Sequence, residues 1–197
     1  MMAHVYVSLG SNVDRENRLR QAMVLLRECF GDIEISPVYD SVAVGFVGSN
    51  FLNLVAGFDT ELGVEAVATA FHNIENQLGR DRSLPKFASR SIDLDILVYD
   101  DLILNAAGIH VPRPEILVNA FVLKPLQDIA PHRLHPETGR SYSAHWQEMA
   151  PAAPQPTKVF NNLGFIFSHC PMVEPAADPI WTIGPSRPTD PPDAIVM

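Results

Sequence analysis

The sequence has little positive charge for its size. Of its 197 residues, 14 are Lys or Arg and 23 are Asp or Glu, which gives a formal net charge of -9 at pH 7. Proteins that bind nucleic acids or anionic membranes in general carry an excess of Lys and Arg, because these side chains neutralise phosphate. We therefore expect no nucleic-acid or membrane partner. A phosphate-containing ligand would need locally concentrated positive charge or a metal ion.

Long apolar runs and clustered cysteines are also missing. No stretch approaches the ~20 consecutive apolar residues that cross a bilayer, and the N-terminal residues show no charged segment followed by an apolar run and a cleavage site. This predicts a cytoplasmic protein. The two cysteines, Cys29 and Cys170, are far apart, which favours neither a disulfide framework nor a metal cluster. Cys29 lies on the apolar side of a predicted helix, so we expect it to pack in the core.

The content of hydrophobic residues, 47%, is enough for one domain with a buried core. Alternation of apolar and polar residues predicts strands, and apolar residues at three- and four-residue spacing predict helices. In chain order, the patterns predict a strand at residues 4–9, a helix at 19–30, strands at 33–44 and 51–58, a helix at 64–78 and a strand at 92–99. This β-α-β-β-α-β order predicts an α+β fold, a ferredoxin-like sandwich with a central antiparallel sheet and flanking helices.

The character of the chain changes toward the C-terminus. Residues 151–197 hold ten of the 17 prolines and show no sustained apolar period. We interpret residues 1–150 as the domain that carries any active site, and residues 151–197 as a proline-rich, largely irregular tail. Such a tail could be a linker or could wrap the domain or a partner.

Two aspartates interrupt the apolar residues of the last predicted strand. Residues two apart in a strand project from the same face about 6.6 Å apart, so Asp93 and Asp95 converge on one region. The other face is predicted to carry Ile92, Leu94, Ile96 and Val98. Mg²⁺ usually binds one or two carboxylates and completes its shell with substrate phosphates and water. Two solvated residues on an exposed face are the alternative, although Asp is a poor strand former and a pair of them in a good strand indicates a functional site.

Basic residues are concentrated just before these aspartates, namely Arg80, Arg82, Lys86 and Arg90. Arginine can hold two phosphate oxygens at once, and phosphoryl transfer depends mainly on positioning and charge stabilisation. The cluster therefore favours a polyphosphate site beside a metal. A solvated basic loop that pairs with the two aspartates is the structural alternative.

Residues 86–97, Lys-Phe-Ala-Ser-Arg-Ser-Ile-Asp-Leu-Asp-Ile-Leu, resemble the signature of the 6-hydroxymethyl-7,8-dihydropterin pyrophosphokinase family. These folate-pathway enzymes transfer pyrophosphate from ATP to a pterin alcohol. Four further segments resemble the family in the same order, namely Leu9-Gly10-Ser11-Asn12, Phe51-Leu52-Asn53, Val111-Pro112 and Phe121-Val122-Leu123-Lys124-Pro125-Leu126. The resemblance covers residues 4–140, and the proline-rich tail has no counterpart in it.

The resemblance implies a role for each matching residue, with ATP as co-substrate and two Mg²⁺ ions. Asp93 and Asp95 would hold the metal ions and, with Arg80 and Arg90, would be the catalytic residues. ATP would be bound by Glu75, Arg82, Lys86, Arg90 and Arg113. The pterin would be bound by Gly45, Phe51, Asn53, Phe87 and Phe121, with Phe51 and Phe121 on the two faces of its ring. Taken alone, each Phe would more often be a core residue, and Glu75 would be a solvated helix residue.

This chain departs from the family pattern at four positions. After Val111-Pro112 the family usually has a His and an aromatic residue, whereas Arg113 and Pro114 stand here. Asn119 replaces a further family arginine, and Phe87 takes the place of a usual Trp. Arg113 can still bind phosphate and Phe87 can still stack, but Asn119 removes positive charge from the predicted centre.

The predicted activity is the transfer of pyrophosphate from ATP to the hydroxymethyl group of a reduced pterin by a monomer. Loops at residues 45–50 and 80–90 would close over the substrates to exclude water. Three alternatives stay open at this point. They are a divergent paralogue that uses another pterin or has lost catalysis, a sugar-nucleotide transferase, and a non-catalytic scaffold whose tail binds a partner. The single short α/β unit at the N-terminus counts against the nucleotide-sugar fold.

Overall fold

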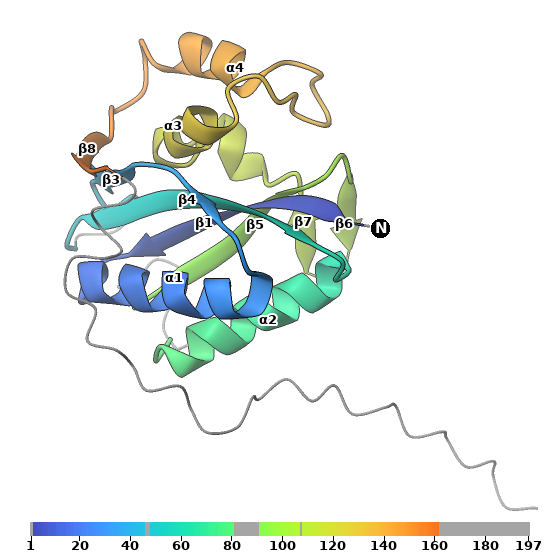
Figure 1. Cartoon of the computed structure of the whole chain (residues 1–197). Helices are drawn as coiled ribbons and strands as arrows, with labels where there is room; N and C mark the ends of the chain where they lie inside the picture. Colours follow the sequence, from blue (N-terminus) through green and yellow to red (C-terminus); the bar gives the residue numbers. More distant parts are fainter. Residues whose placement is uncertain (1, 46–47, 81–90, 107, 162–197) are drawn as a thin grey trace, which may run out of the picture.

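The computed structural model describes residues 2–45, 48–80, 91–106 and 108–161 (Figure 1). Its elements are β1 (Ala3–Ser11), α1 (Arg15–Phe30), β2 (Glu34–Ile35), β3 (Val38–Ser41), β4 (Phe51–Thr60), α2 (Val64–Gln77), β5 (Asp93–Tyr99), β6 (Leu104–Ala106), β7 (Ile109–Val111), the 3-10 helix η1 (Pro114–Leu117), α3 (Ala120–Ile129), α4 (Tyr142–Met149) and β8 (Thr157–Phe160). The main sheet has the order β5-β1-β4-β3-β8, with β2 paired to β4, and a separate hairpin joins β6 to β7. All the strand pairs are antiparallel. The predicted ferredoxin-like α+β sandwich is confirmed.

Helices cover both faces of the sheet. Figure 1 shows α1 and α2 side by side on one face and α3 and α4 on the other. The first face carries the larger apolar cluster, in which Leu9 and Leu94 of the sheet pack with Leu26 of α1 and Phe71 of α2. The second cluster joins Leu97 to apolar residues of α3 and α4. Each strand between the two clusters therefore presents alternate side chains to different helices.

Both predicted helices lie where the apolar spacing placed them. Gly31 follows α1 at φ 78° and its N–H donates to the carbonyl of Arg27 at 2.9 Å, and Gly79 follows α2 at φ 76°. Glycine adopts this left-handed backbone without the steric cost that a Cβ brings, which explains why both helices end at glycine. Cys29 packs against the larger cluster, and burial raises the pKa of its thiol.

The strand pattern differs from the prediction in two places. The run at residues 33–44 is divided at Ser36, whose buried hydroxyl accepts a hydrogen bond at 2.9 Å from the N–H of Val55 in place of a regular backbone partner. Pro37 follows, and its lack of an N–H further interrupts the ladder. In β5, the pairing with β1 shifts between Tyr6 and Val7. This bulge turns Val98 to the α3 face beside Leu97, so the predicted placement of Val98 with Leu94 is wrong.

The sequence patterns missed the second helical layer. Pro125 lies inside α3, where its missing N–H and ring would be taken to interrupt a helix. Farther on, β8 pairs with β3, so the sheet extends beyond the predicted boundary at residue 150. The tail at 151–197, predicted to be largely irregular, therefore contains a strand, and its residues 162–197 lie outside the described ranges. Over the residues described, no helix is long and apolar enough to span a membrane, and the cytoplasmic location stays a prediction.

Candidate active site

A row of polar and small residues crosses three strands on the α3 face of the sheet. Gly10 of β1 pairs directly with Asn53 of β4 on one side and with Asp93 of β5 on the other. Phe51 and Asp95 lie two residues along their strands and therefore share this face. A Cβ added at Gly10 would lie 3.3 Å from Oδ1 of Asn53 and 3.8 Å from the Phe51 ring. The absence of a side chain at Gly10 thus leaves the floor of the site flat between the aspartates and Asn53.

Asp93 is paired with Arg80, which follows α2. One guanidinium nitrogen of Arg80 donates to Oδ1 of Asp93 and also to Oε1 of Glu75. Glu75 is 1% exposed, and the same Oε1 accepts a hydrogen bond at 2.9 Å from the N–H of Leu94. The alternative interpretation of Glu75 as a solvated helix residue is therefore wrong, and its predicted role in ATP binding stays a prediction. Its carboxylate joins α2, Arg80 and the outer edge of β5.

Asp95 is paired with Arg113, which follows β7. Nη2 of Arg113 lies 2.7 Å from Oδ1 of Asp95, and its Nε lies 3.4 Å from a carboxylate oxygen of Glu115. The backbone N–H of Arg113 donates to the carbonyl of Leu97 at 2.8 Å, which fixes this segment against β5 just after the cis Val111–Pro112 peptide bond. Both aspartates thus face an arginine, and the two arginines come from different parts of the chain.

The donor set at Asp93 and Asp95 suits a hard divalent cation. Their carboxylates lie on the same face of one strand, as predicted, and are partly exposed to solvent. Within the described ranges, no group of three or more His, Cys, Asp or Glu side chains gathers so as to hold a metal ion. Two carboxylates nevertheless match the number that Mg²⁺ uses when phosphates and water supply its other ligands. The site therefore fits a metal that arrives with a phosphate ligand.

Two of the predicted pterin residues, Phe51 and Asn53, lie at the other end of the same row. Asn53 is buried, and its Nδ2 donates to Oγ of Ser41 at 2.8 Å, which leaves its Oδ1 facing Gly10. Phe51 is half-buried at the start of β4, and Phe121 is half-buried at the start of α3 against the second apolar cluster. Gly45 is exposed and has a φ of 86°. The structure brings Phe51 and Asn53 to the site face, and the roles of Gly45 and Phe121 stay predictions.

Four predicted residues lie outside the described ranges, namely Arg82, Lys86, Phe87 and Arg90. Their roles stay predictions. Asn119, which replaces the family arginine, is the residue before α3.

Sequence reasoning gave no role to three residues that build the site. Ser11 is fully buried, and its hydroxyl donates at 2.5 Å to the carbonyl of Ser91, just before β5. Nδ2 of Asn12 donates at 3.2 Å to the carbonyl of Ser49. Asp40 accepts hydrogen bonds at 2.7 Å from both Arg15 and Asn50. These bonds fasten the ends of the segments that border the site, and the Gly10-Ser11-Asn12 turn was the available signal for two of them.

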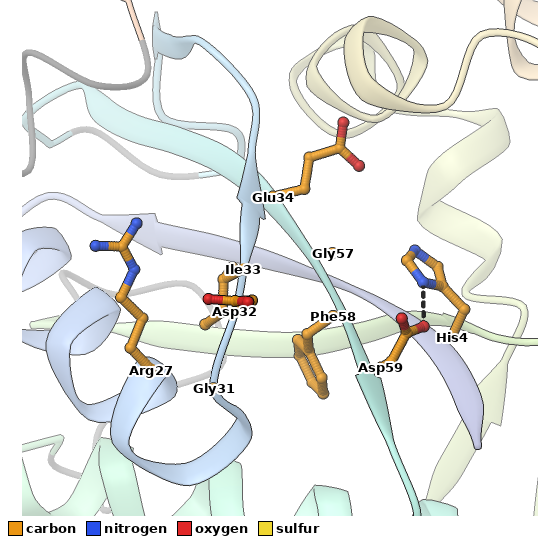
Figure 2. A pocket seen from close by; sticks show the side chains of 9 residues that line it. All are labelled: His4, Arg27, Gly31, Asp32, Ile33, Glu34, Gly57, Phe58 and Asp59. Atoms are coloured by element: carbon orange, nitrogen blue, oxygen red, sulfur yellow. Dashed lines mark hydrogen bonds and ion pairs between the residues drawn. The ribbon is translucent and has the colours of Figure 1, made fainter. Parts of the chain in front are cut away.

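Two cavities border the sheet away from this row. Figure 2 shows the first, of about 620 Å³, where His4 and Asp59 point toward each other with Nδ1 and Oδ1 2.7 Å apart. His4 lies six residues before Gly10, or about 20 Å along β1. The second cavity, of about 910 Å³, lies between Tyr39, Lys124 and Lys158. Neither cavity includes the paired aspartates.

Comparison with known proteins agrees with this arrangement. The sequence model of the family described as 7,8-dihydro-6-hydroxymethylpterin-pyrophosphokinase (HPPK) matches residues 6–131. The chain is 37% identical over 137 residues to the 2-amino-4-hydroxy-6-hydroxymethyldihydropteridine pyrophosphokinase of Aquifex aeolicus, covering 68% of this chain and 85% of that protein. It is 35% identical over 158 residues to the protein of the same name from Pseudomonas aeruginosa, covering 78% of this chain and 94% of that one.

The fold is shared with solved structures. The wild-type Plasmodium falciparum HPPK-DHPS crystal structure superposes with a TM-score of 0.61 at 12% identity over 77% of this chain. This chain spans 45% of the length of that protein, so only the fold of one part of it is compared. The family match and the two bacterial relatives show that the chain described here is a pyrophosphokinase by class. It belongs to the 7,8-dihydro-6-hydroxymethylpterin-pyrophosphokinase family.

Proposed function

We propose that this chain transfers the terminal diphosphate of ATP to the hydroxymethyl group of 6-hydroxymethyl-7,8-dihydropterin, as a monomer. The hydroxymethyl oxygen attacks the β-phosphorus of ATP. The bond between this phosphorus and the oxygen that bridges it to the α-phosphorus breaks, and AMP leaves with that oxygen. The hydroxyl proton is released, so the products are AMP, the pterin diphosphate and one proton. The reaction needs no covalent enzyme intermediate.

One observation carries this proposal, namely the pairing of Asn53, Gly10 and Asp93 across three adjacent strands. Neighbouring strands are about 4.8 Å apart, so Asn53 and Asp93 are separated by about 10 Å. A pterin bound at Asn53 and Phe51 would place its hydroxymethyl group toward phosphates held at the aspartates. The buried amide of Asn53 supplies a donor and an acceptor for the ring edge, and Gly10 allows the flat ring to lie close to the sheet.

The charged residues would hold the nucleotide. Arg80 and Arg113 lie against the aspartates and supply the guanidinium groups that phosphate oxygens require. Glu75 keeps Arg80 in place from its buried position, so we assign it a positioning role rather than direct contact with ATP. The predicted contributions of Arg82, Lys86 and Arg90 would add positive charge to the same region.

Two Mg²⁺ ions, held by Asp93 and Asp95, would neutralise the phosphate oxygens and align donor and acceptor when bound. The residues of this chain then have three tasks. Asp93 and Asp95 anchor the ion-bound phosphates, Arg80 and Arg113 orient them, and the pterin residues place the acceptor oxygen in line. Exclusion of water would follow closure of the segments around residues 45–50 and 80–90.

A time course of AMP formation with ATP, Mg²⁺ and a panel of reduced pterins tests the proposal. We expect AMP to appear with 6-hydroxymethyl-7,8-dihydropterin and to be absent when the pterin or Mg²⁺ is omitted. AMP formation with a different pterin alone would favour the divergent paralogue. If no pterin supports AMP formation, calorimetry with α,β-methylene ATP separates an impaired enzyme, which binds the analogue, from a scaffold, which does not.

A further inference from the structure

The arginine partners of the two aspartates differ in how firmly they are held. Arg80 contacts Asp93 and also the carboxylate of Glu75, which is 1% exposed. Separating a buried carboxylate from its partner is costly, because the charge is left without compensation in a poorly solvated place. Arg80 therefore stays bound to α2 whatever ligand Asp93 takes.

Arg113 has a fixed backbone but an exchangeable side chain. Its N–H is held by the carbonyl of Leu97 at 2.8 Å. Among the residues described, its guanidinium pairs with the carboxylates of Asp95 and Glu115, which solvent reaches. The Asp95 side chain is 34% exposed, and that of Glu115 is 44% exposed. Ion pairs that solvent partly reaches contribute little free energy, so the guanidinium can change partner at small cost.

A divalent cation at Asp95 would compete with Arg113. Both are positive, and Nη2 of Arg113 already lies 2.7 Å from Oδ1 of Asp95, so a cation bound through this oxygen would meet the guanidinium. A polyphosphate removes this conflict, because it offers the guanidinium a pair of phosphate oxygens in the geometry that arginine prefers.

We propose, on the basis of the function given above, that Arg113 is an internal counter-ion of Asp95. It leaves this carboxylate to the cation when the phosphates of the nucleotide accept its guanidinium. Cation and nucleotide therefore strengthen each other's binding, and the coupling is reciprocal by thermodynamic necessity. A cation without nucleotide binds weakly, because it must displace Arg113 without providing a new partner.

The test compares Arg113→Gln with Arg140→Gln and with the wild-type protein. Arg140 pairs with Glu148 at 2.7 Å in an exposed contact beside α4, so its replacement changes the net charge equally at a place that serves no ligand. Binding of Mn²⁺ to the protein alone is measured by electron paramagnetic resonance. The affinity for α,β-methylene ATP is measured by calorimetry with and without Mn²⁺, with correction for the complex that forms in solution.

Arg113→Gln should raise the affinity for Mn²⁺ alone about fivefold, because an ion pair of this exposure opposes the cation by roughly that factor. It should also reduce, by a similar factor, the ratio by which Mn²⁺ improves binding of the ATP analogue. Arg140→Gln should change neither quantity. An unchanged or lower Mn²⁺ affinity in Arg113→Gln overturns the proposal, as does the absence of measurable Mn²⁺ binding in both proteins.

The ratio by which Mn²⁺ improves binding of the ATP analogue distinguishes the counter-ion role from a long-range charge effect. Simple removal of a positive charge would raise Mn²⁺ affinity with and without nucleotide alike, so an unchanged ratio in Arg113→Gln also overturns the counter-ion role. The outcome is separate from the proposed reaction. Wild-type protein that forms no AMP, together with a higher Mn²⁺ affinity and a lower ratio in Arg113→Gln, would reject the reaction and support the counter-ion.

Discussion

Glu75 of α2 accepts a hydrogen bond at 2.9 Å from the backbone N–H of Leu94 in β5. Among the residues described, β5 is an edge strand, and no strand lies beyond it to receive this N–H. The carboxylate thus completes the hydrogen bonding of β5 between the two aspartates. The same oxygen accepts from Arg80, which links the edge of the sheet to the charge balance of the site.

Replacement of Glu75 by Gln should destabilise the fold by about 2 kcal/mol, because a charged hydrogen bond to Arg80 is lost while an acceptor for Leu94 remains. Glu75→Ala should cost more, about 3–5 kcal/mol, since it leaves the arginine without its buried partner. Urea unfolding measures the free energy of unfolding of both variants. Glu65→Gln, an exposed change in the first turn of the same helix, is the matched control and should cost under about 1 kcal/mol. If Glu75→Gln unfolded at the same urea concentration as the control variant, the structural role of Glu75 would be refuted.

Asp95→Asn should lower the rate of AMP formation by about a thousandfold or more, because metal-assisted charge stabilisation contributes several kcal/mol to the transition state. The fold should persist, since Asp95 is partly exposed and its ion pair with Arg113 contributes at most about 1 kcal/mol. AMP release under saturating substrates and thermal unfolding are the two measurements. Near-normal AMP production by a folded Asp95→Asn protein would exclude the mechanism.

Gly10→Ala should impair pterin binding while leaving the fold largely stable. The added Cβ would lie 3.3 Å from Oδ1 of Asn53, so this amide must move by a few tenths of an ångström. We expect the KM for the pterin to rise about tenfold, because small displacements of positioning groups are costly, with little change in the KM for ATP. Gly63→Ala, whose Cβ would meet only ordinary contacts, is the control. Equal KM values for the pterin in the two variants would show that Gly10 is not part of its site.

The stability of the fold should fall in mild acid through His135. Burial, opposed by the charge of Glu137, lowers the pKa of this imidazole from its ordinary value of 6.5. The unfolded chain therefore takes up a proton at a higher pH than the folded chain does. The stability from neutral His135 is present in full above about pH 6.5 and is lost as the pH falls toward the lower folded pKa.

Thermal unfolding of His135→Asn, measured between about pH 7.5 and 5.5, tests this linkage. The amide oxygen can still accept the hydrogen bond that Nδ1 of His135 receives from the N–H of Glu137 at 3.3 Å, but it does not titrate. The variant should lose less stability on acidification than the wild-type protein does. His132→Asn, at an exposed position, should keep the wild-type dependence. His145, whose pKa is also lowered by burial, accounts for part of the dependence of stability on pH that remains in the His135→Asn variant.

The parts of the fold that follow simple periodicity were predictable. The helix ends at Gly31 and Gly79 and the common face of Asp93 and Asp95 are local properties, fixed by backbone freedom and by alternation. Val98 was misplaced because a bulge depends on the pairing of β5 with β1, which no single strand sequence contains. The helix around Pro125 was missed because its packing against the sheet outweighs an unfavourable local residue.

In the candidate site, too, local features were predictable and features that depend on tertiary contacts were not. The aspartates and Arg80 were found because their residue types are unusual for their positions. The burial of Glu75 was not found, since it depends on an unpaired N–H in a strand nearly twenty residues away. The contact between Arg113 and Asp95 likewise requires β7 and η1 to return the chain to β5, which spacing alone does not reveal.

The sheet order also separates the strand that carries the aspartates from the last strand described. β5, which carries the aspartates, and β8, from which the chain continues toward its C-terminus, form opposite edges of the main sheet. Four strand spacings amount to about 19 Å. A second enzyme or an affinity tag joined directly after β8 would therefore begin far from the edge that carries Asp93 and Asp95, so this end of the sheet is a suitable place for genetic fusion.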